Sequence, residues 1–378
     1  MATDNNNKVL NVPNLRFPGF GGEWEREKLR DKCSFYSGGT PSSSNKSYYN
    51  GEIPFIRSGE ISGDSTELFL SEFGLNNSSA KMVDIGDLLL ALYGATSGQI
   101  AISKIRGAIN QAILCIKSSY DNIFLKSVWE KHVDKILQAY LQGGQGNLSA
   151  DIVKNLSFYF PSLDEQNKIS KLIVLIDERI ATQNKIIEDL KKLKVAIRDK
   201  QLNTIRKHYG LNYQICDLLD YEQPTKYVVT DTEYSEDRSK TPVLTANKAF
   251  ILGYTDESFG VYDKGACIIL DDFTLDCKYV DFPFKVKSSA IKILTVKNGC
   301  SLRYVYEYLN YMNLETTEHK RHYISEIEPM IIAYSTDKKG IDDFNNIMSS
   351  FESKIEIENK YLQSLLTQKV YLLSNMFI

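Results

Sequence analysis

Two long segments that contain neither glycine nor proline constrain this chain more than any other feature of its sequence. They span residues 162–209 and 341–378, whereas glycine and proline recur through residues 11–161 and 210–340. These two residue types are the least compatible with a helix interior, so each uninterrupted segment predicts one long helix. At about 1.5 Å per residue such helices would be roughly 70 Å and 55 Å long, which exceeds the core of an ordinary domain.

The first segment has the pattern of a coiled-coil helix. A capping box, Ser162-Leu-Asp-Glu165, follows Pro161, and Gly210 closes the segment. Its apolar residues recur at the heptad spacing that joins two helices along a seam. The seam consists of Ile169, Leu172, Ile176, Ile186, Leu190, Leu193 and Ile197, is widened by Ile173, Ile180 and Ile187, and is interrupted by Arg179, Gln183 and Lys200. Arg179 and Gln183 are therefore candidates for contacts that fix the pairing.

The second segment is a copy of the first. A shift of 175 residues brings equivalent positions together: Ile169 with Phe344, Ile176 with Phe351, Asn184 with Asn359, Leu190 with Leu365 and Lys194 with Lys369. A chance match would not stay in step over a whole helix, so we predict two equivalent helices that pair antiparallel. The residues expected in this pair or in contact with partner proteins are Ile169, Ile176, Arg179, Gln183, Leu190, Phe344, Phe351 and Leu365.

The turn-rich regions also resemble each other. "YYNGEIPFIRSGEI" (48–61) is similar to "SKTPVLTANKAF" (239–250), and "GDLLLALYGATSG" (86–98) is similar to "GACIILDDFTLD" (265–276). In each, a short strand-like run leads into a polar loop. We predict an α+β fold in which two globular α/β domains are separated by two long antiparallel coiled-coil helices, with an internal pseudo-two-fold repeat.

This interpretation divides the chain into four parts. They are a first domain over 1–161, in which 1–14 form a disordered tail, a central helix over 162–210, a second domain over 211–335, and a C-terminal helix over 336–378.

Charge is distributed unevenly along a chain whose net charge is −3. Residues 161–210 carry eleven lysines and arginines against seven acidic residues, whereas residues 211–335 carry thirteen against nineteen. A DNA-binding role would therefore depend on local basic patches and on help from partner proteins. The first ten residues lack the apolar stretch of a signal peptide, and no apolar run approaches the roughly 20 residues of a membrane span. We expect a cytoplasmic protein that binds no membrane.

Common catalytic motifs are missing from the sequence. There is no GxxxxGK[ST] phosphate loop, no GxSxG or HExxH motif, and no N/D-P-P-Y/F motif of amino-methyltransferases. The six cysteines include no CxxC pair and only four histidines are present, which argues against a zinc site or a disulfide framework. We predict that the chain has no catalytic residue, no metal site and no bound cofactor.

Polar loops of the kind that read nucleic acid are present in both domains. Arginine can form two hydrogen bonds with guanine, and asparagine or glutamine can do so with adenine. The candidates in the first domain are Arg57, Ser58, Tyr93, Thr96, Ser97, Gln142, Gln145 and Asn147. Those in the second are Asn247, Lys248, Thr274, Lys278, His319, Lys320, Arg321 and His322, of which the last four form the densest cationic patch. Any one of these residues, taken alone, is more often an ordinary solvated surface residue. The prediction of DNA binding therefore depends on the presence of similar polar loops in both domains.

Several stretches, in their order along the chain, resemble the specificity subunits of type I restriction-modification systems. Similar to that family's first target-recognition domain are "LRFPGFGGEWEREKLRD" (15–31), "GGTPSSSNKSYYNGEIPFI" (38–56), "GDLLLALYGATSGQIAI" (86–102) and "GAINQAI" (107–113). The bridge to the central helix is "GNLSADIVKNLSFYFPSLDEQNKIS" (146–170), and a second recognition domain is indicated by "TPVLTANKAFILGYT" (241–255) and "DDFTLDCKYVDFPFKVKSSAIKIL" (271–294). The Pro-x-x-x-Glu-Gln entry at 161–166 is replaced by Ser335-Thr-Asp-Lys-Lys-Gly340 before the second helix.

The resemblance implies a DNA-recognition subunit that has no catalysis of its own. Each domain would read one half of a bipartite, asymmetric target in double-stranded DNA, and the helices would set the spacer. Methyltransferase subunits would supply S-adenosylmethionine and methylate adenine N6. Restriction/translocase subunits would supply ATP- and magnesium-dependent translocation and cleavage.

Two other classes of function stay open at this point. A self-contained DNA methyltransferase or nuclease with its own recognition domains would transfer methyl groups or cleave DNA without any partner. A coiled-coil scaffold protein would dimerise through the helices and would show no sequence-selective retention of DNA, even with partners present.

Overall fold

The computed structural model describes residues 10–141, 148–247, 249–297, 299–316, 318 and 320–378. The chain forms two compact units, Met1–Asn184 with Lys360–Ile378, and Lys185–Asn359. Each unit contains one sheet-rich domain and a part of both long helices. The unit boundaries fall at Asn184 and Asn359, which are equivalent positions of the 175-residue repeat.

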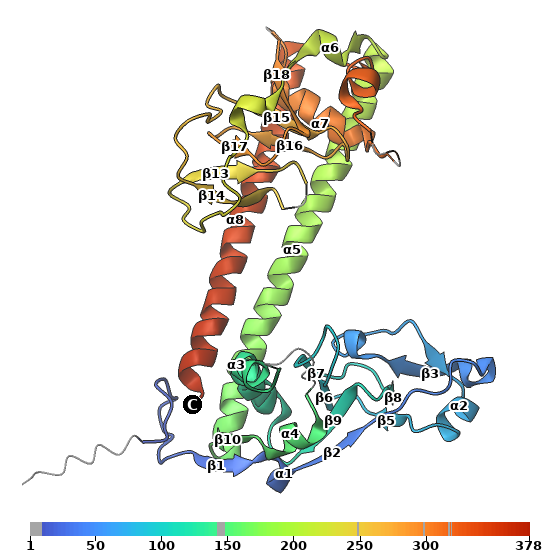
Figure 1. The fold of residues 1–378 in the computed structure, drawn as a ribbon, viewed down its shortest axis with the longest axis vertical. Helices are drawn as coiled ribbons and strands as arrows, with labels where there is room; N and C mark the ends of the chain where they lie inside the picture. Colours follow the sequence, from blue (N-terminus) through green and yellow to red (C-terminus); the bar gives the residue numbers. More distant parts are fainter. Residues whose placement is uncertain (1–9, 142–147, 248, 298, 317, 319) are drawn as a thin grey trace, which may run out of the picture. The chain divides into compact units, whose positions relative to one another are not determined.

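The two long helices are α5 (Leu163–Tyr209) and α8 (Lys338–Met376), drawn in green and in red in Figure 1. In the first unit the start of α5 packs against the end of the chain, because Ile169 and Ile173 share a core with Met376 and Phe377. In the second unit Leu202, near the end of α5, shares a core with Phe344 near the start of α8. The helices are therefore antiparallel in each unit, as the sequence predicted.

The domain of the first unit contains two four-stranded sheets and a small two-stranded one. One sheet has the order β2-β9-β6-β7 (Cys33–Ser37, Ile113–Ser118, Leu88–Ala91, Ile100–Ile102), and the other the order β4-β3-β8-β5 (Phe69–Leu70, Tyr49–Ile56, Gly107–Ile109, Lys81–Val83). The small sheet pairs β1 (Glu25–Lys28) with β10 (Ser157–Phe160). The helices are α1 (Leu29–Lys32), α2 (Glu72–Asn76), α3 (Asn122–Leu141) and α4 (Ala150–Asn155), with short turns η1 (Lys46–Tyr48) and η2 (Ser58–Glu60).

The domain of the second unit follows the same plan. Its sheets have the orders β12-β18-β15-β16 (Leu219–Glu222, Ile291–Val296, Cys267–Asp271, Cys277–Val280), β14-β13-β17 (Ile251–Thr255, Thr241–Leu244, Lys285–Val286) and β11-β19 (Tyr213–Gln214, Ile331–Ile332). Its helices are α6 (Ile215–Leu218) and α7 (Leu302–Met312), with turns η3 (Pro224–Tyr227) and η4 (Tyr323–Ile327).

The strand orders show that the domains themselves are repeated. Strands β2, β9, β6 and β7 correspond in order to β12, β18, β15 and β16. The second sheet of each domain holds one parallel pair, β3 with β8 and β13 with β17, whereas its other pairs are antiparallel. The two sequence similarities noted above fall on β3 with β13 and on β6 with β15. The predicted α+β fold with an internal repeat is therefore confirmed.

Continuous apolar runs explain the two central strands of this plan. Leu88–Ala91 in β6 and Cys267–Asp271 in β15 are buried along their whole length, because successive side chains of each strand point to opposite faces of the sheet and enter two different cores. Each run ends where polar residues begin, which releases the chain from the sheet into a loop. The two loops that follow are among those predicted to read DNA.

Two neighbouring residues tie the start of α5 to the first domain. Glu165 and Gln166 are each 1% exposed. Glu165 pairs with Arg16 at 2.7 Å, and Gln166 accepts a hydrogen bond from the backbone amide of Asp121 at 3.1 Å. The helix α8 starts without this pair: the amide of Asp337 donates to Ser335 Oγ at 3.0 Å instead.

Residues 1–9 of the expected N-terminal tail lie outside the described residues. The following residues make contacts, since the amide of Trp24 donates to the carbonyl of Asn11 at 2.7 Å and that of Leu15 donates to the carbonyl of Asn375 at 2.8 Å. Among the residues that the structure describes, no helix combines the length and the apolar character needed to cross a membrane.

The heptad assignment was wrong in the middle of α5. Ile186 and Leu193, placed in the seam, are 40% and 49% exposed, whereas Ile187 is 5% exposed. An α-helix has 3.6 residues per turn, so an apolar stripe drifts by about 20° per heptad and moves onto the neighbouring residue. Of the other seam residues named above, Ile169, Ile176, Gln183, Phe344 and Leu365 are buried, Leu190 and Phe351 are half-buried, and Arg179 is exposed.

Candidate nucleic-acid interface

Three of the predicted loops meet in the second domain. Thr274 Oγ1 donates to Asn247 Oδ1 at 3.3 Å, which joins the loop after β15 to the loop after β13. The guanidinium of Arg321 lies 5.9 Å from the centre of the Phe273 ring, which brings the third loop to the same place. Asn247, Thr274 and Arg321 are all exposed. An amide, a hydroxyl and a guanidinium from separate parts of the chain are thus presented together.

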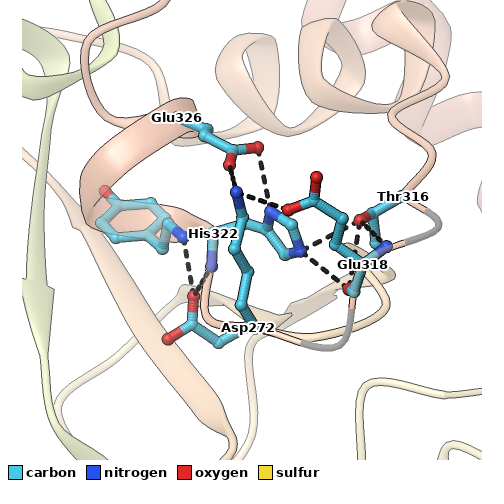
Figure 2. Close-up of polar contacts among 7 residues, drawn as sticks. Asp272, Thr316, Glu318, His322 and Glu326 are labelled. Atoms are coloured by element: carbon cyan, nitrogen blue, oxygen red, sulfur yellow. Dashed lines mark hydrogen bonds and ion pairs between the residues drawn. The ribbon is translucent and has the colours of Figure 1, made fainter.

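A buried aspartate holds these loops in place. Asp272 Oδ1 accepts hydrogen bonds from the backbone amides of His322 and Tyr323 at 3.0 and 2.7 Å, as Figure 2 shows. Its other oxygen, Oδ2, is 3.6 Å from Lys292 Nζ, and both side chains are 2% exposed. Since an unpaired buried charge is costly, the Asp272–Lys292 pair fixes where the chain after β15 meets the turn η4.

His322 faces inward and closes this loop. Its Nδ1 is 2.9 Å from Glu326 Oε2, and its Nε2 is 3.0 Å from Thr316 Oγ1 and 3.2 Å from the carbonyl of Glu318 (Figure 2). A doubly protonated ring can donate to both sides at once. The hydrogen bond to Glu326 raises the pKa of His322, although burial opposes the charge. We expected His322 to contact DNA; its side chain is 2% exposed and contacts its own loop.

Lys320 and Lys278, two other candidates, differ in their surroundings. Lys320 is exposed and lies 2.6 Å from Glu318 and 3.0 Å from Glu326, and these carboxylates raise its pKa. Lys278 is half-buried on β16. The remaining candidates Gln142, Gln145, Asn147, Lys248 and His319 lie outside the described residues.

Arg57 in the first domain is bound by two carboxylates. It precedes the turn η2, and its Nη2 is 2.9 Å from Glu60 Oε1 and 2.6 Å from Glu67 Oε2. Burial disfavours the charge of Glu60, but hydrogen bonds from Arg57 and from the amides of Glu67 and Arg57 outweigh it and lower the pKa of Glu60 to about 2. Nε and Nη2 of Arg57 are held by these carboxylates, of which Glu67, with its side chain 80% exposed, is the more accessible to solvent.

A hollow adjoins the loop of Arg57. Its volume is about 500 Å³, and its lining includes Ile61 and Ser62 after η2 together with Ser97 and Gln99 after β6. Ser97 Oγ donates to the carbonyl of Leu92 at 2.9 Å, and Ser58, Tyr93, Thr96 and Ser97 are half-buried. The loops after β3 and β6 are thus neighbours, as are the loops after the equivalent strands β13 and β15.

The residues that sequence reasoning missed are the supporting acids and one buried lysine. Glu60, Glu67, Asp272 and Glu326 look like ordinary surface acids in the sequence. Lys292 alone gave a signal in the sequence, because it interrupts the apolar strand Ile291–Val296. A charged residue in such a strand requires a buried partner.

Comparisons with known proteins agree with these features. Residues 21–192 match the family described as type I restriction modification DNA specificity domain. The chain is 50% identical over 115 residues to the type I restriction enzyme EcoR124I/EcoR124II specificity subunit of Escherichia coli, which covers 29% of this chain and 28% of that protein. It is 24% identical over 298 residues to the MjaIX specificity subunit of Methanocaldococcus jannaschii, which covers 74% of this chain and 67% of that protein.

Similarity to solved structures extends over nearly the whole chain. The S subunit of a type I restriction-modification system from M. genitalium has a TM-score of 0.63 at 14% identity, and the match covers 97% of this chain and 99% of that chain. The fold is that of a protein with two similar α+β domains on an antiparallel helix pair. Residues 21–192 carry the domain of the type I restriction-modification specificity subunits, and the resemblance read from the motifs is confirmed.

The His322–Glu326 pair predicts a pH dependence of stability. A raised pKa means that the pair contributes fully below the ordinary histidine pKa of about 6.5, and the contribution is lost as pH rises through the raised value. The thermal midpoint of the wild type should therefore exceed that of Glu326→Gln at pH 6, and the gap should narrow by pH 9 to what the Lys320–Glu326 pair contributes. The exposed His208, replaced by Gln, should leave the difference unchanged. A gap that stays constant from pH 6 to 9 would contradict the pairing.

Proposed function

We propose that this chain is the DNA-specificity subunit of a type I restriction-modification complex and reads a bipartite, asymmetric target in double-stranded DNA. The observation that carries the proposal is the repeated domain plan: in both domains the polar loops follow the same two strands, β3 and β6 or β13 and β15. The loops carry different side chains in the two domains. Two recognition domains that share a fold but differ in their loop side chains are suited to bind two DNA half-sites of different sequence.

The proposed contacts are the loop residues predicted from the sequence. Arg57, Ser58, Tyr93, Thr96, Ser97, Gln142, Gln145 and Asn147 would serve one half-site, and Asn247, Lys248, Thr274, Lys278, His319, Lys320 and Arg321 the other. His322 would hold the loop of Lys320 and Arg321 in place through its contacts with Thr316, Glu318 and Glu326. The loops would enter the major groove at two patches about 10 base pairs apart.

Partner subunits would supply the chemistry. Methyltransferase subunits with S-adenosylmethionine would modify adenine N6, and restriction/translocase subunits with ATP and magnesium would move and cut DNA, all in the cytoplasm. The net charge of −3 supports this division, since partners would then share the phosphate contacts that dominate DNA affinity. Exposed apolar residues on the long helices, namely Leu175, Ile186, Leu193, Val370 and Tyr371, support docking of the methyltransferase there.

Co-expression tests the proposed function and identifies the target. The chain would be produced with the methyltransferase of its own system in a host that lacks other N6-adenine methylation, and the host DNA would be sequenced for N6-methyladenine. We expect one bipartite motif. Methyl transfer or cleavage by the purified chain alone would favour a self-contained enzyme, and methylation that does not depend on the chain would favour a scaffold.

Replacing one exposed arginine should disturb one half of that motif. Arg321→Ala removes a guanidinium from the loop cluster of the second domain, and loss of a specific base contact costs about 1–3 kcal/mol of discrimination. Methylome sequencing should show relaxed choice at one or two positions of one half-site. The other half-site, read by the first domain, is the internal control; relaxation of both would point to a folding or assembly defect.

Lengthening both helices should lengthen the spacer only. One heptad inserted after Asn184 and one after Asn359 add ~10.5 Å to each helix and keep the apolar stripe nearly in phase. Because DNA rises 3.4 Å per base pair, the spacer should grow by about three base pairs. The methylated motif should keep both half-sites. An unchanged spacer in an active variant would mean that the helices do not set it.

A further inference from the structure

Two lysines at equivalent positions of the repeat are each held between two carboxylates. Lys194 lies on α5 and Lys369 on α8, and they coincide when the sequence is shifted by 175 residues. In each unit one carboxylate comes from the other long helix and one comes from a helix of the globular domain. Three helices therefore meet at one lysine in each unit.

In the first unit the lysine is Lys369. Its Nζ is 2.8 Å from Asp177 Oδ1 on α5 and 3.6 Å from Glu130 Oε2 on α3. The side chain of Lys369 is 20% exposed. Burial disfavours its charge, but the hydrogen bond to Asp177 and the charge of Glu130 outweigh burial and raise the pKa of Lys369.

In the second unit the lysine is Lys194. Its Nζ is 2.7 Å from Glu307 Oε1 on α7 and 2.8 Å from Glu352 Oε1 on α8. Lys194 is 17% exposed and Glu307 is 1% exposed. Arg303, also on α7, pairs with the other oxygen of Glu352. The cluster thus connects α7 to both long helices.

The repeat keeps the arrangement although it does not keep every residue. Asp177 and Glu352 coincide under the same 175-residue shift as the lysines. Glu130 is the ninth residue of α3 whereas Glu307 is the sixth residue of α7, so the third member comes from a different turn of the domain helix. In both units the lysine therefore pairs with a glutamate of the domain helix, although the glutamate stands at a different position within that helix.

These clusters restrain the helices in a way that the apolar stripe cannot. A stripe of isoleucine and leucine can shift by one turn, about 5.4 Å, and still bury similar side chains. The same shift would move a largely buried lysine away from its carboxylates and leave its ammonium group without a partner. By contrast, the exposed pair Lys192–Glu188 joins two residues of one helix and is indifferent to such a shift.

We propose that Lys194 and Lys369 are positioning residues that fix the axial register of the helix pair and the position of each recognition domain along it. In this way they would fix the length of the DNA spacer. The inference rests on the function proposed above. Neither lysine contacts DNA; each acts through the carboxylates of the helices around it.

Spacer fidelity is the property that tests this role. Lys194→Met and Lys369→Met keep the length of the side chain and remove its charge. Each variant would be co-expressed with the methyltransferase and the methylome sequenced. Both half-sites should stay unchanged, while methylated sites with a spacer one or two base pairs longer or shorter should rise roughly tenfold or more, since the wrong register no longer leaves a buried ammonium unpaired.

Charge-conserving and surface variants serve as controls. Lys194→Arg should restore the single spacer because it keeps the charge, and Lys192→Met should behave like the wild type because its side chain is 69% exposed. If the methionine variants do not accumulate as folded protein, Asp177→Asn and Glu352→Gln weaken the same two clusters with little change of shape and decide the question by the same measurement.

The outcomes separate the two proposals. If the wild type gives no bipartite methylation, the proposed function fails. If the wild type gives it and the charge-removing variants keep a single spacer, with only a lower yield of methylation and a lower thermal midpoint, the lysines merely stabilise the fold and the inference is overturned. A change in the sequence of either half-site would overturn it as well.

Discussion

An amphipathic helix cannot bury its apolar stripe by itself and needs a second surface to cover it. The rest of this structure depends on how the stripes of the two long helices are covered. The stripe of α5 begins at Ile169 and Ile173, which are buried against the end of α8 in one unit, and continues to Leu202, which is buried against its start in the other. One chain thus supplies both halves of its helix pair, because the module was repeated. Each domain core is continuous with a part of that pair, so neither domain is suspended on a flexible linker.

The loops that we propose to read DNA are held by ion pairs with residues next to them. Asp272 and Lys292 form a buried pair under the loops of the second domain, and Glu60 holds Arg57 in the first. A side chain that is held in place before binding loses less conformational entropy on contact with a base. The carboxylates around Arg57 and Lys320 would compete with phosphate, so DNA bound as we propose would have to displace them. Such competition would favour targets whose bases replace the lost ion pairs with matching hydrogen bonds.

Ion pairs have two roles in this molecule, and the degree of burial decides which role a pair has. On the surface of the helices a pair such as Lys192–Glu188 is largely exposed to solvent, and its contribution to stability is small. Where α3 or α7 meets the long helices, lysines with about one fifth of their side chains exposed are held by two carboxylates each. Partial burial turns an ordinary surface charge into a constraint on register, because water no longer compensates for a lost partner.

The sequence alone determined the two long helices, their repeat, the α+β plan and the positions of several loops, because periodicity and the absence of glycine and proline are local properties. It also pointed to Asn247, Thr274 and Arg321, although not to their meeting place. Only the tertiary structure decided that His322 faces inward, that Arg57 is held by Glu67, and that the stripe passes from Ile186 to Ile187. The first two depend on contacts between residues far apart in the chain, which no local pattern records, and the third depends on which side of the widened apolar stripe the neighbouring elements cover.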